Sequence, residues 1–484
     1  MLFTTPVFLF CFLPAVLAGY YLVPARLRGL RNLWLLAASL VFYAAGEPSF
    51  VFVLCASCLA NWAAGLLVGP GRRGGRTVLA LAIAANLALL FRCKYLVFAV
   101  GECNRLLGAG FRVPDIALPL GVSFFTFQAM SYVIDVHRGV SRPQRNPLDV
   151  ALYVVLFPQL VAGPIVRYET VAEELRNRRE TWDDVSAGVC RFAEGLAKKM
   201  LLANPLAVVA DSAFDGADWI PAAAAGGPAS TAMAWLGALA FALQIYFDFS
   251  GYSDMAIGMG RMFGFHFHEN FLHPYAATSV SGFWRRWHVS MGTWFRDYVY
   301  FPLGGSRVAT RARLLANLLV VWTLTGIWHG ANWTFLCWGL FHFALIAAEK
   351  LAGWRPEGRG ALRAAAGWLA TATAVLLGWV LFRAASLGEA LAYLRAMLGR
   401  GGAPLRDLAS ALLLREHAAV FAVAIPLCLP VAPALERLAD RLCATPGRAA
   451  VRAVLRAAWL AFLFAASLSF VAKGAHNPFL YFNF

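Results

Sequence analysis

Long apolar runs, separated by short polar and basic segments, recur along the whole chain. Uncharged apolar runs of about twenty residues are typical of helices that cross a lipid bilayer, so the pattern predicts an all-α polytopic membrane protein. Several runs are shorter than a perpendicular helix needs, which predicts broken or re-entrant helices and about nine to twelve spans in all. The predicted spans are Phe3–Val23, Leu33–Ala45, Phe50–Val68, Val78–Phe91, Leu148–Val166, Ala232–Gly251, Leu314–Trp328, Trp333–Ala348, Ala365–Phe382, Ala418–Leu435 and Ala457–Val471.

Two further segments, Trp182–Leu202 and Leu387–Leu398, have an amphipathic pattern and are predicted to lie along the membrane surface. Residues between Val100 and Ile116 and between Arg176 and Asp184 are polar and loop-like. Internal repeats and a second domain are not evident. The sequence therefore predicts one integral-membrane domain, 1–484, whose motifs gather in a core at about 120–350.

Composition supports this class, because 60% of the residues are hydrophobic and only 14% are charged. The net charge of +16 raises the possibility of a nucleic-acid partner. The basic residues, however, gather in short loops such as Arg26–Arg31 and Arg72–Arg76, the positive-inside pattern that sets orientation in a membrane. The blocks Arg355–Arg363 and Arg437–Arg456 are likewise expected to be cytoplasmic, which puts the final HNPFLYFNF outside. We predict membrane lipids, and no nucleic acid, as partners.

The first apolar segment resembles a signal peptide, with VLA before Gly19 as a possible cleavage site. No Lys or Arg precedes it, and the arginines follow it, so we interpret it as an uncleaved span with its N-terminus outside. Of the nine cysteines, only Cys55 and Cys58 lie close together, one helical turn apart within a span. We interpret them as small core residues.

One titratable residue, His329, lies within the apolar stretch TGIWHGANWTF. Burying a polar group without a partner costs roughly 2–7 kcal/mol, so an imidazole at this place needs a reason. His329 follows Arg313 by about sixteen residues, or roughly 24 Å of helix, and so is expected well inside the membrane or towards its far face. A lone buried histidine is more often structural, with its ring bonded to a carbonyl, and the spacing at His329 alone favours neither a structural nor a functional role.

The neighbours of His329 favour function. Thr325 and Gly326 precede it on the same helical face and leave room for a substrate beside the ring. Trp322, Trp328 and Trp333 are expected to form the walls of that space, and Asn332 is an additional polar contact.

The middle of the chain carries more ionisable residues than an ordinary membrane bundle. Asp254 lies in DFSGYSDMAIGMGRMFGFHFHENF, and FWRRWHVSMGTWFRDYVYFPLGG contains Arg285, His288, Arg296 and Asp297. Ionisable groups at membrane depth usually face a cavity, one another or a substrate path. The alternative is an interfacial loop, whose arginines contact lipid headgroups.

A neutral imidazole can take a proton from a hydroxyl and later return it, which suits acyl transfer from a thioester. His288 is the candidate for a second polar contact to the donor or acceptor. His266 and His268 stand two residues apart and do not share a helical face, so no metal site is predicted. Neither a phosphate-binding G-x-x-x-x-G-K-[ST] loop nor a G-x-S-x-G elbow occurs, which argues against an ATPase or a serine hydrolase.

Five stretches resemble the membrane-bound O-acyltransferase family, in particular its bacterial alginate O-acetyltransferase branch. They are FPQLVAGPIVRY, DFSGYSDMAIGMGRMFGF, FWRRWHVSMGTWFRDYVYFPLGG, LTGIWHGANWTFLCWGLFH and the final NPFLYFNF. The WRRWH and WHG blocks together are highly specific. The D-alanyl transfer protein of teichoic acid modification is similar at a greater distance.

The resemblance implies that His329 is the catalytic histidine and His288 the second recurrent one. It implies a ring of tilted helices around a central tunnel in a bacterial inner membrane. The donor would be acetyl-CoA or a similar thioester, with no bound cofactor, and the acceptor an exported polysaccharide or a periplasmic transferase partner. The expected substrate-binding residues are Trp284, Arg285, Trp287, Arg296, Asp297, Trp328, Asn332 and Asp254.

Two other classes stay open from the sequence. A transporter or flippase would also place Asp, Arg and His residues inside the membrane. A purely structural subunit that anchors a soluble transferase would tolerate the loss of both histidines. The sequence leaves open the acceptor glycan, the donor thioester, the partner, the oligomeric state and the helix count.

Overall fold

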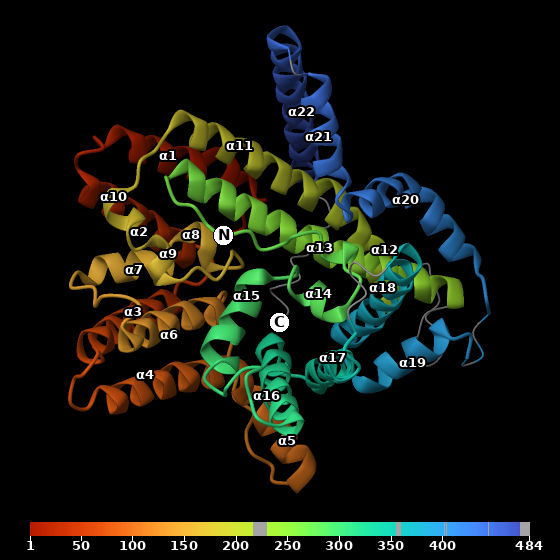
Figure 1. The fold of residues 1–484 in the computed structure, drawn as a ribbon, viewed down its shortest axis with the longest axis horizontal. Coiled ribbons are helices and arrows are strands. Elements are labelled where there is room, and N and C mark those ends of the chain that lie inside the picture. The colour runs from red at the N-terminus through yellow and green to blue at the C-terminus, as the bar shows by residue number, and fades with distance from the viewer. Residues whose placement is uncertain (216–229, 355–359, 401, 403, 444, 475–484) are drawn as a thin grey trace. The chain divides into compact units, whose positions relative to one another are not determined.

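A computed structural model describes residues 1–215, 230–354, 360–400, 402, 404–443 and 445–474. These ranges are helical, with no β-strand among them, which confirms the predicted all-α class (Figure 1). The final motif NPFLYFNF, and Arg355 of one predicted basic block, lie outside the described residues.

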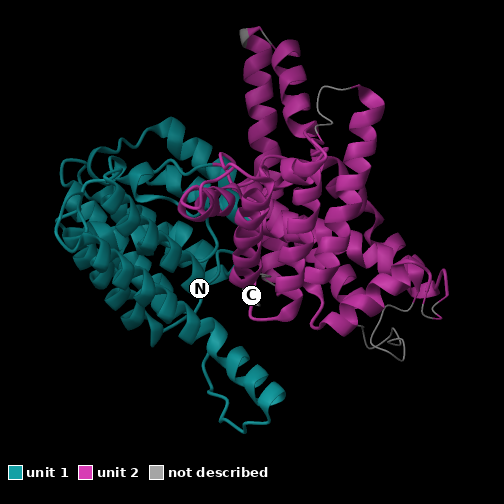
Figure 2. Ribbon diagram, turned by 60° about the horizontal axis from the view of Figure 1, so that its bottom comes forward, with its two compact units in different colours: residues 1–192, 252–268 teal, residues 193–251, 269–484 magenta. Residues whose placement is uncertain are grey.

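The chain forms two compact units, each made of two separate stretches of sequence (Figure 2). Unit 1 comprises 1–192 and 252–268, and unit 2 comprises 193–251 and 269–484. Helices α11 (Trp182–Ala197) and α13 (Thr231–Met262) contribute residues to both. Unit 1 also contains η1 (Phe8–Phe12), α1 (Leu13–Leu22), α2 (Arg28–Ala44), α3 (Phe50–Leu67), α4 (Gly75–Leu90), η2 (Phe91–Tyr95), α5 (Leu96–Leu107), α6 (Val122–Arg138), α7 (Pro147–Val155), α8 (Phe157–Leu160), α9 (Tyr168–Val171) and α10 (Glu174–Asn177).

Unit 2 contains His288 and His329. Its further elements are η3 (Lys198–Ala203), α12 (Asn204–Phe214), η4 (Pro274–Ala276), α14 (Val280–Trp284), α15 (Val289–Phe295), η5 (Arg296–Tyr300), α16 (Arg311–His329), α17 (Trp333–Leu351), α18 (Ala361–Arg383), α19 (Leu387–Met397), α20 (Leu408–Leu427), α21 (Val431–Leu442) and α22 (Pro446–Ala472).

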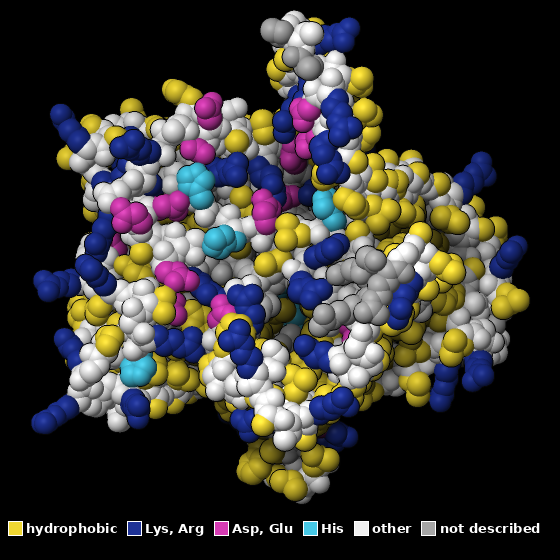
Figure 3. All heavy atoms as spheres, viewed as in Figure 1, with side chains coloured by type: hydrophobic (Ala, Val, Ile, Leu, Met, Phe, Trp, Pro, Cys, Tyr) yellow, Lys and Arg dark blue, Asp and Glu magenta, His cyan; other side chains and the backbone are white. Residues whose placement is uncertain are grey.

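Within the described residues, seven helices are long and apolar enough to cross a membrane. They are Phe50–Leu67, Gly75–Leu107, Thr231–Met262, Trp333–Leu351, Ala361–Arg383, Leu408–Leu427 and Gly447–Ala472. Figure 3 shows hydrophobic side chains exposed over broad areas of the surface, as lipid contact requires. The chain is a multi-pass membrane protein.

The predicted span Leu148–Val166 is wrong, because the chain leaves the helical conformation at Leu156. In a continuous helix the Phe157 amide would donate to the Tyr153 carbonyl. Here it donates to Ser39 Oγ at 3.1 Å, and the Gln159 side chain donates to the Tyr153 carbonyl instead.

The other errors have similar local causes. The predicted span Ala418–Leu435 joins two helices, because α20 ends at Leu427 after Pro426, and Pro430 precedes α21. Helix α6 was not predicted, because buried polar residues such as Gln128 and Asp135 interrupt its apolar pattern. Helix α5 also extends into the predicted loop as far as Leu107. The amphipathic segments do form helices, α11 with η3, and α19.

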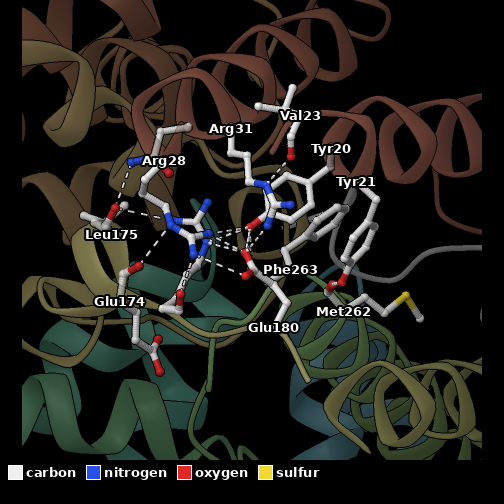
Figure 4. A network of polar contacts seen from close by, with 12 residues as sticks. Tyr20, Tyr21, Val23, Arg28, Arg31, Glu174, Leu175, Glu180, Met262 and Phe263 are labelled. Atoms are coloured by element: carbon white, nitrogen blue, oxygen red, sulfur yellow. Dashed lines mark hydrogen bonds and ion pairs between the residues drawn. The ribbon is translucent and has the colours of Figure 1, made fainter. Parts of the chain in front are cut away.

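A polar network ties the first two helices of unit 1 to other parts of the same unit (Figure 4). The Glu180 carboxylate accepts hydrogen bonds from Arg28 and Tyr20 and lies 3.0 Å from Arg31 Nη1. Arg178 Nε donates to Tyr20 Oη at 2.9 Å. Burial alone would raise the pKa of the Glu180 carboxyl, but the hydrogen bonds from Arg28 and Tyr20 outweigh it and lower that pKa to about 2.

Replacing Glu180 by glutamine should destabilise unit 1, because it leaves buried arginines without their counter-charge. Removing one partner of a buried ion pair typically costs about 3–5 kcal/mol. Since the pKa of Glu180 lies below its unfolded value, the contribution is complete at neutral pH and is lost as the pH falls towards 2. Thermal unfolding of the detergent-purified chain at pH 7 measures the loss. The matched control is Glu173→Gln at an exposed carboxylate; an equal melting temperature for both variants would contradict the account.

Candidate functional site

Helices α16 and α17 form a tight hairpin that fixes the position of His329. A Cβ atom added to Gly326 would lie 2.5 Å from the Phe335 carbonyl oxygen, and one added to Gly339 would lie 2.5 Å from that of Trp322. The two glycines therefore allow close backbone approach. This corrects the sequence interpretation of Gly326, whose missing side chain leaves room for α17 rather than for a substrate.

His329 is the last residue of α16 and is only 4% exposed. Three aromatic rings surround its imidazole, with centroid distances of 4.9 Å to Trp328, 5.0 Å to Trp338 and 5.2 Å to Phe382. All three meet it edge to face.

The other two predicted wall residues lie differently. Trp322 packs against the rings of Trp284, Trp338 and His342. Trp333 is 41% exposed, so it does not form a closed wall.

His288 is fully buried and immediately precedes α15. Its backbone has φ 44°, a left-handed conformation that is unusual for a residue with a side chain. Its ring centroid lies 4.6 Å from that of Phe249 and 6.0 Å from that of Trp328. Burial lowers the pKa of His288 to about 3, so this imidazole is neutral at physiological pH. Trp328 is thus a ring neighbour of both predicted histidines, which the fold brings into one aromatic site.

A carboxylate from α17 binds the start of α14, the short helix that leads into the WRRWH segment. Glu349 accepts hydrogen bonds from the amides of Val280 and Ser281, at 2.5 and 2.9 Å, at the start of α14. Trp284, at the end of α14, donates from Nε1 to His342 Nδ1 at 3.3 Å. Its ring also packs against Trp338, a neighbour of His329.

Other predicted substrate-binding residues have structural contacts. Trp287 is buried and packs between Phe283 and Trp379 in the core. Asn332 caps α17 by accepting from the Thr334 amide, and its Nδ2 donates to the Ala385 carbonyl. One end of the Asn332 amide thus bonds at the start of α17 and the other at the turn between α18 and α19, and its substrate contact stays a prediction.

Three of the four charged candidates form ion pairs. Arg296 Nε lies 2.7 Å from Asp297 Oδ1, so these two adjacent residues pair with each other. Arg285 is exposed. Asp254 belongs to unit 1, where its carboxylate lies 2.6 Å from Arg191 Nη2.

Sequence reasoning missed three residues that shape the site: Asn270, Glu349 and His342. Each is a polar residue next to or within an apolar run, the same signal that pointed to His329. Asn270 follows the charged Glu269, which made it look like part of a loop. Among the described residues, no group of three or more His, Cys, Asp or Glu residues is arranged to hold a metal ion.

The chain is thus a multi-pass helical membrane protein in which the rings of two buried histidines both neighbour one tryptophan. Comparison with known proteins gives the family. The membrane-bound O-acyltransferase family model matches residues 125–354. A probable alginate O-acetylase of Azotobacter vinelandii is 42% identical over 417 residues, which cover 84% of this chain and 80% of the relative. The corresponding protein of Pseudomonas putida is 39% identical over the full length of both chains.

A third relative, a peptidoglycan O-acetyltransferase of Helicobacter pylori, is 34% identical over 84% of this chain and 82% of its own length. The chain belongs to the membrane-bound O-acyltransferase family and is an O-acyltransferase.

The Gly326→Ala variant should lower both thermal stability and activity, because the added methyl group forces α16 away from α17 and moves His329. Overpacking of this kind typically costs about 1–3 kcal/mol. The control is Gly29→Ala, since a Cβ at that helical position meets nothing within 4 Å. Melting temperatures and transfer rates of the two variants check the prediction, which fails if Gly326→Ala behaves like Gly29→Ala.

Proposed function

We propose that this protein moves an acetyl group, or another small acyl group, from a cytoplasmic thioester across the bacterial inner membrane. The acceptor is a hydroxyl of an exported polysaccharide, or a periplasmic transferase that passes the acyl group on, as in alginate O-acetylation. The observation that carries the proposal is the pair of buried histidines whose rings both neighbour Trp328, in a chain of this family. The relatives named as alginate and peptidoglycan O-acetylating proteins support the acceptor class.

In the proposed reaction His329 is the general base. Its imidazole takes the proton of the acceptor hydroxyl as the oxygen attacks the thioester carbonyl. The new C–O bond forms, the C–S bond breaks, and the imidazolium returns the proton to the departing thiolate. The proton taken from the hydroxyl ends on the thiol, and no atom changes its oxidation state. The reaction therefore needs only the acceptor and the donor, acetyl-CoA or a similar thioester, and no bound cofactor.

The surrounding residues serve the same reaction. His288 stays neutral because of its burial, so it is suited to accept a hydrogen bond from a second, non-reacting hydroxyl of the acceptor and thereby to orient the acceptor. The rings of Trp338 and Phe382 cover His329 and limit the access of water, which would otherwise hydrolyse the thioester. A tunnel at His329, expected from the family resemblance, would let the acyl group cross while the carrier stays in the cytoplasm.

One observation favours a second candidate, a transporter or flippase. Lys199 Nζ lies 2.7 Å from Asp248 Oδ1 in a buried ion pair whose acidic member is on the candidate span α13. Buried charges at membrane depth often mark substrate paths. This class predicts substrate flux that does not depend on a thioester.

The variant His329→Ala should abolish acyl transfer without lowering the amount of membrane-inserted protein. The His288→Ala variant should slow turnover at least about tenfold, which corresponds to about 1.4 kcal/mol of transition-state stabilisation. Transfer of labelled acetyl groups from acetyl-CoA, normalised to inserted protein, measures both. The control is His417→Ala, since that imidazole bonds a backbone carbonyl within α20. Near-normal transfer by His329→Ala would remove this residue from the mechanism.

Removing the whole chain from the cell should strip acetyl groups from an exported glycan while leaving the amount of glycan unchanged. Mass analysis of exported glycans, with and without the chain, checks this. If the chain is a transporter, its removal should instead lower the quantity of exported substrate. If it is a purely structural anchor, the double variant His288→Ala, His329→Ala, returned to cells that lack the chain, should restore normal acetylation.

A further inference from the structure

Asn270 makes four hydrogen bonds to three consecutive residues, His288, Val289 and Ser290. Its backbone carbonyl accepts from the Val289 amide at 3.0 Å. Its side-chain oxygen Oδ1 lies 3.2 Å from the Ser290 amide nitrogen, 3.0 Å from Ser290 Oγ and 3.2 Å from His288 Nδ1. Asn270 is 1% exposed, so this arrangement is shielded from water.

The backbone fixes which way the Asn270 amide points. The Ser290 amide nitrogen can only donate a hydrogen bond, so the side-chain atom of Asn270 that faces it must be the acceptor oxygen and not the NH₂ group. The orientation of an asparagine amide is ordinarily a matter of inference, but a backbone donor at this distance decides it.

The orientation of that amide in turn decides which ring nitrogen of His288 carries the proton. An imidazole nitrogen without hydrogen is an acceptor, and two acceptors facing each other at 3.2 Å would repel. Nδ1 must therefore carry the hydrogen and donate it to Asn270 Oδ1. The Ser290 hydroxyl also lies closer to Asn270 Oδ1, at 3.0 Å, than to His288 Nδ1, at 3.4 Å, so it donates to the amide.

We propose that Asn270 is a positioning residue that holds His288 as the Nδ1–H tautomer and thereby makes Nε2 the hydrogen-bond-accepting nitrogen of this imidazole. The group recognised by Nε2 is then a donor, such as a second hydroxyl of the acyl acceptor beside the one whose proton His329 takes. This inference deepens the proposed function and rests on it for the role of His288.

The same bonds keep His288 in its unusual backbone conformation. Two bridges join the segments on either side, from the Val289 amide to the Asn270 carbonyl and from the Leu272 amide to the Arg286 carbonyl. A left-handed conformation is unfavourable for a residue with a side chain and persists only where the surroundings of that residue determine it. These bonds therefore fix both the direction of the His288 ring and the ring nitrogen that carries the proton.

The test is nitrogen NMR of the full-length chain labelled with ¹⁵N-histidine, with His288→Ala used to assign the resonances. The two neutral tautomers give different nitrogen shifts and proton couplings. The wild-type spectrum is expected to show protonated Nδ1 and bare Nε2 for His288, and the variant serves only to assign these signals. A protonated Nε2 in the wild type would overturn the proposal.

Kinetics of two variants separate positioning from a general structural role. Asn270→Ala is expected to lower kcat about ten- to hundredfold, the range typical for residues that orient a functional histidine, with the KM of the thioester donor changed less than about threefold. Asn270→Asp keeps an acceptor oxygen and should recover most of kcat together with the Nδ1–H signature. Equal losses in both variants, or an unchanged His288 spectrum in Asn270→Ala, would contradict the proposal.

The matched control is Asn146→Ala in unit 1, an asparagine whose side chain likewise accepts from a backbone amide, that of Leu148 at 3.1 Å, but at an exposed helix start. It should leave both the His288 signals and kcat unchanged. The spectrum also distinguishes the two proposals: if His329→Ala stays active while His288 shows the Nδ1–H form, the proposed function fails and the tautomer assignment stands.

Discussion

The close approach of α16 and α17 is the constraint on which the site depends. Gly326 and Gly339 face the partner helix at distances that no side chain would fit, so the hairpin holds His329 in one place. Trp338 on α17 then packs against the imidazole of His329 on one side and against His342 and Trp284 on the other. The position of His329 thus depends on packing between two backbones, several residues from the ring itself.

Sequence alone predicted the class of fold and the two histidines, since both depend on local pattern. Apolar runs identify membrane helices, and a titratable group inside such a run is conspicuous. What stayed hidden depends on contacts between distant segments. The break at Leu156 needs Ser39 from another helix, and the aromatic wall at His329 needs Phe382 from α18. Asn270 follows a charged residue, as a loop residue often does, and only the structure shows that its side chain contacts His288.

The predicted substrate contacts also show what a sequence pattern cannot decide. Asn332, Trp287 and Gly326 stand beside the histidines in the sequence, yet each has a packing or capping role. Proximity in sequence pointed to this region but could not separate residues with packing or capping contacts from residues available to a substrate. The two histidines remain the groups whose chemistry suits acyl transfer, one at the end of a helix and one held neutral by burial.

The most direct test is a high-resolution map of the chain in a lipid nanodisc with a non-transferable acetyl-CoA analogue. The account predicts the carbonyl carbon of the analogue close enough to the His329 ring for a hydroxyl to fit between them, with the reacting atoms about 3–3.5 Å apart once the acceptor binds. A bound analogue whose acyl group ends far from His329, with that ring sealed by Trp328, Trp338 and Phe382, would contradict it.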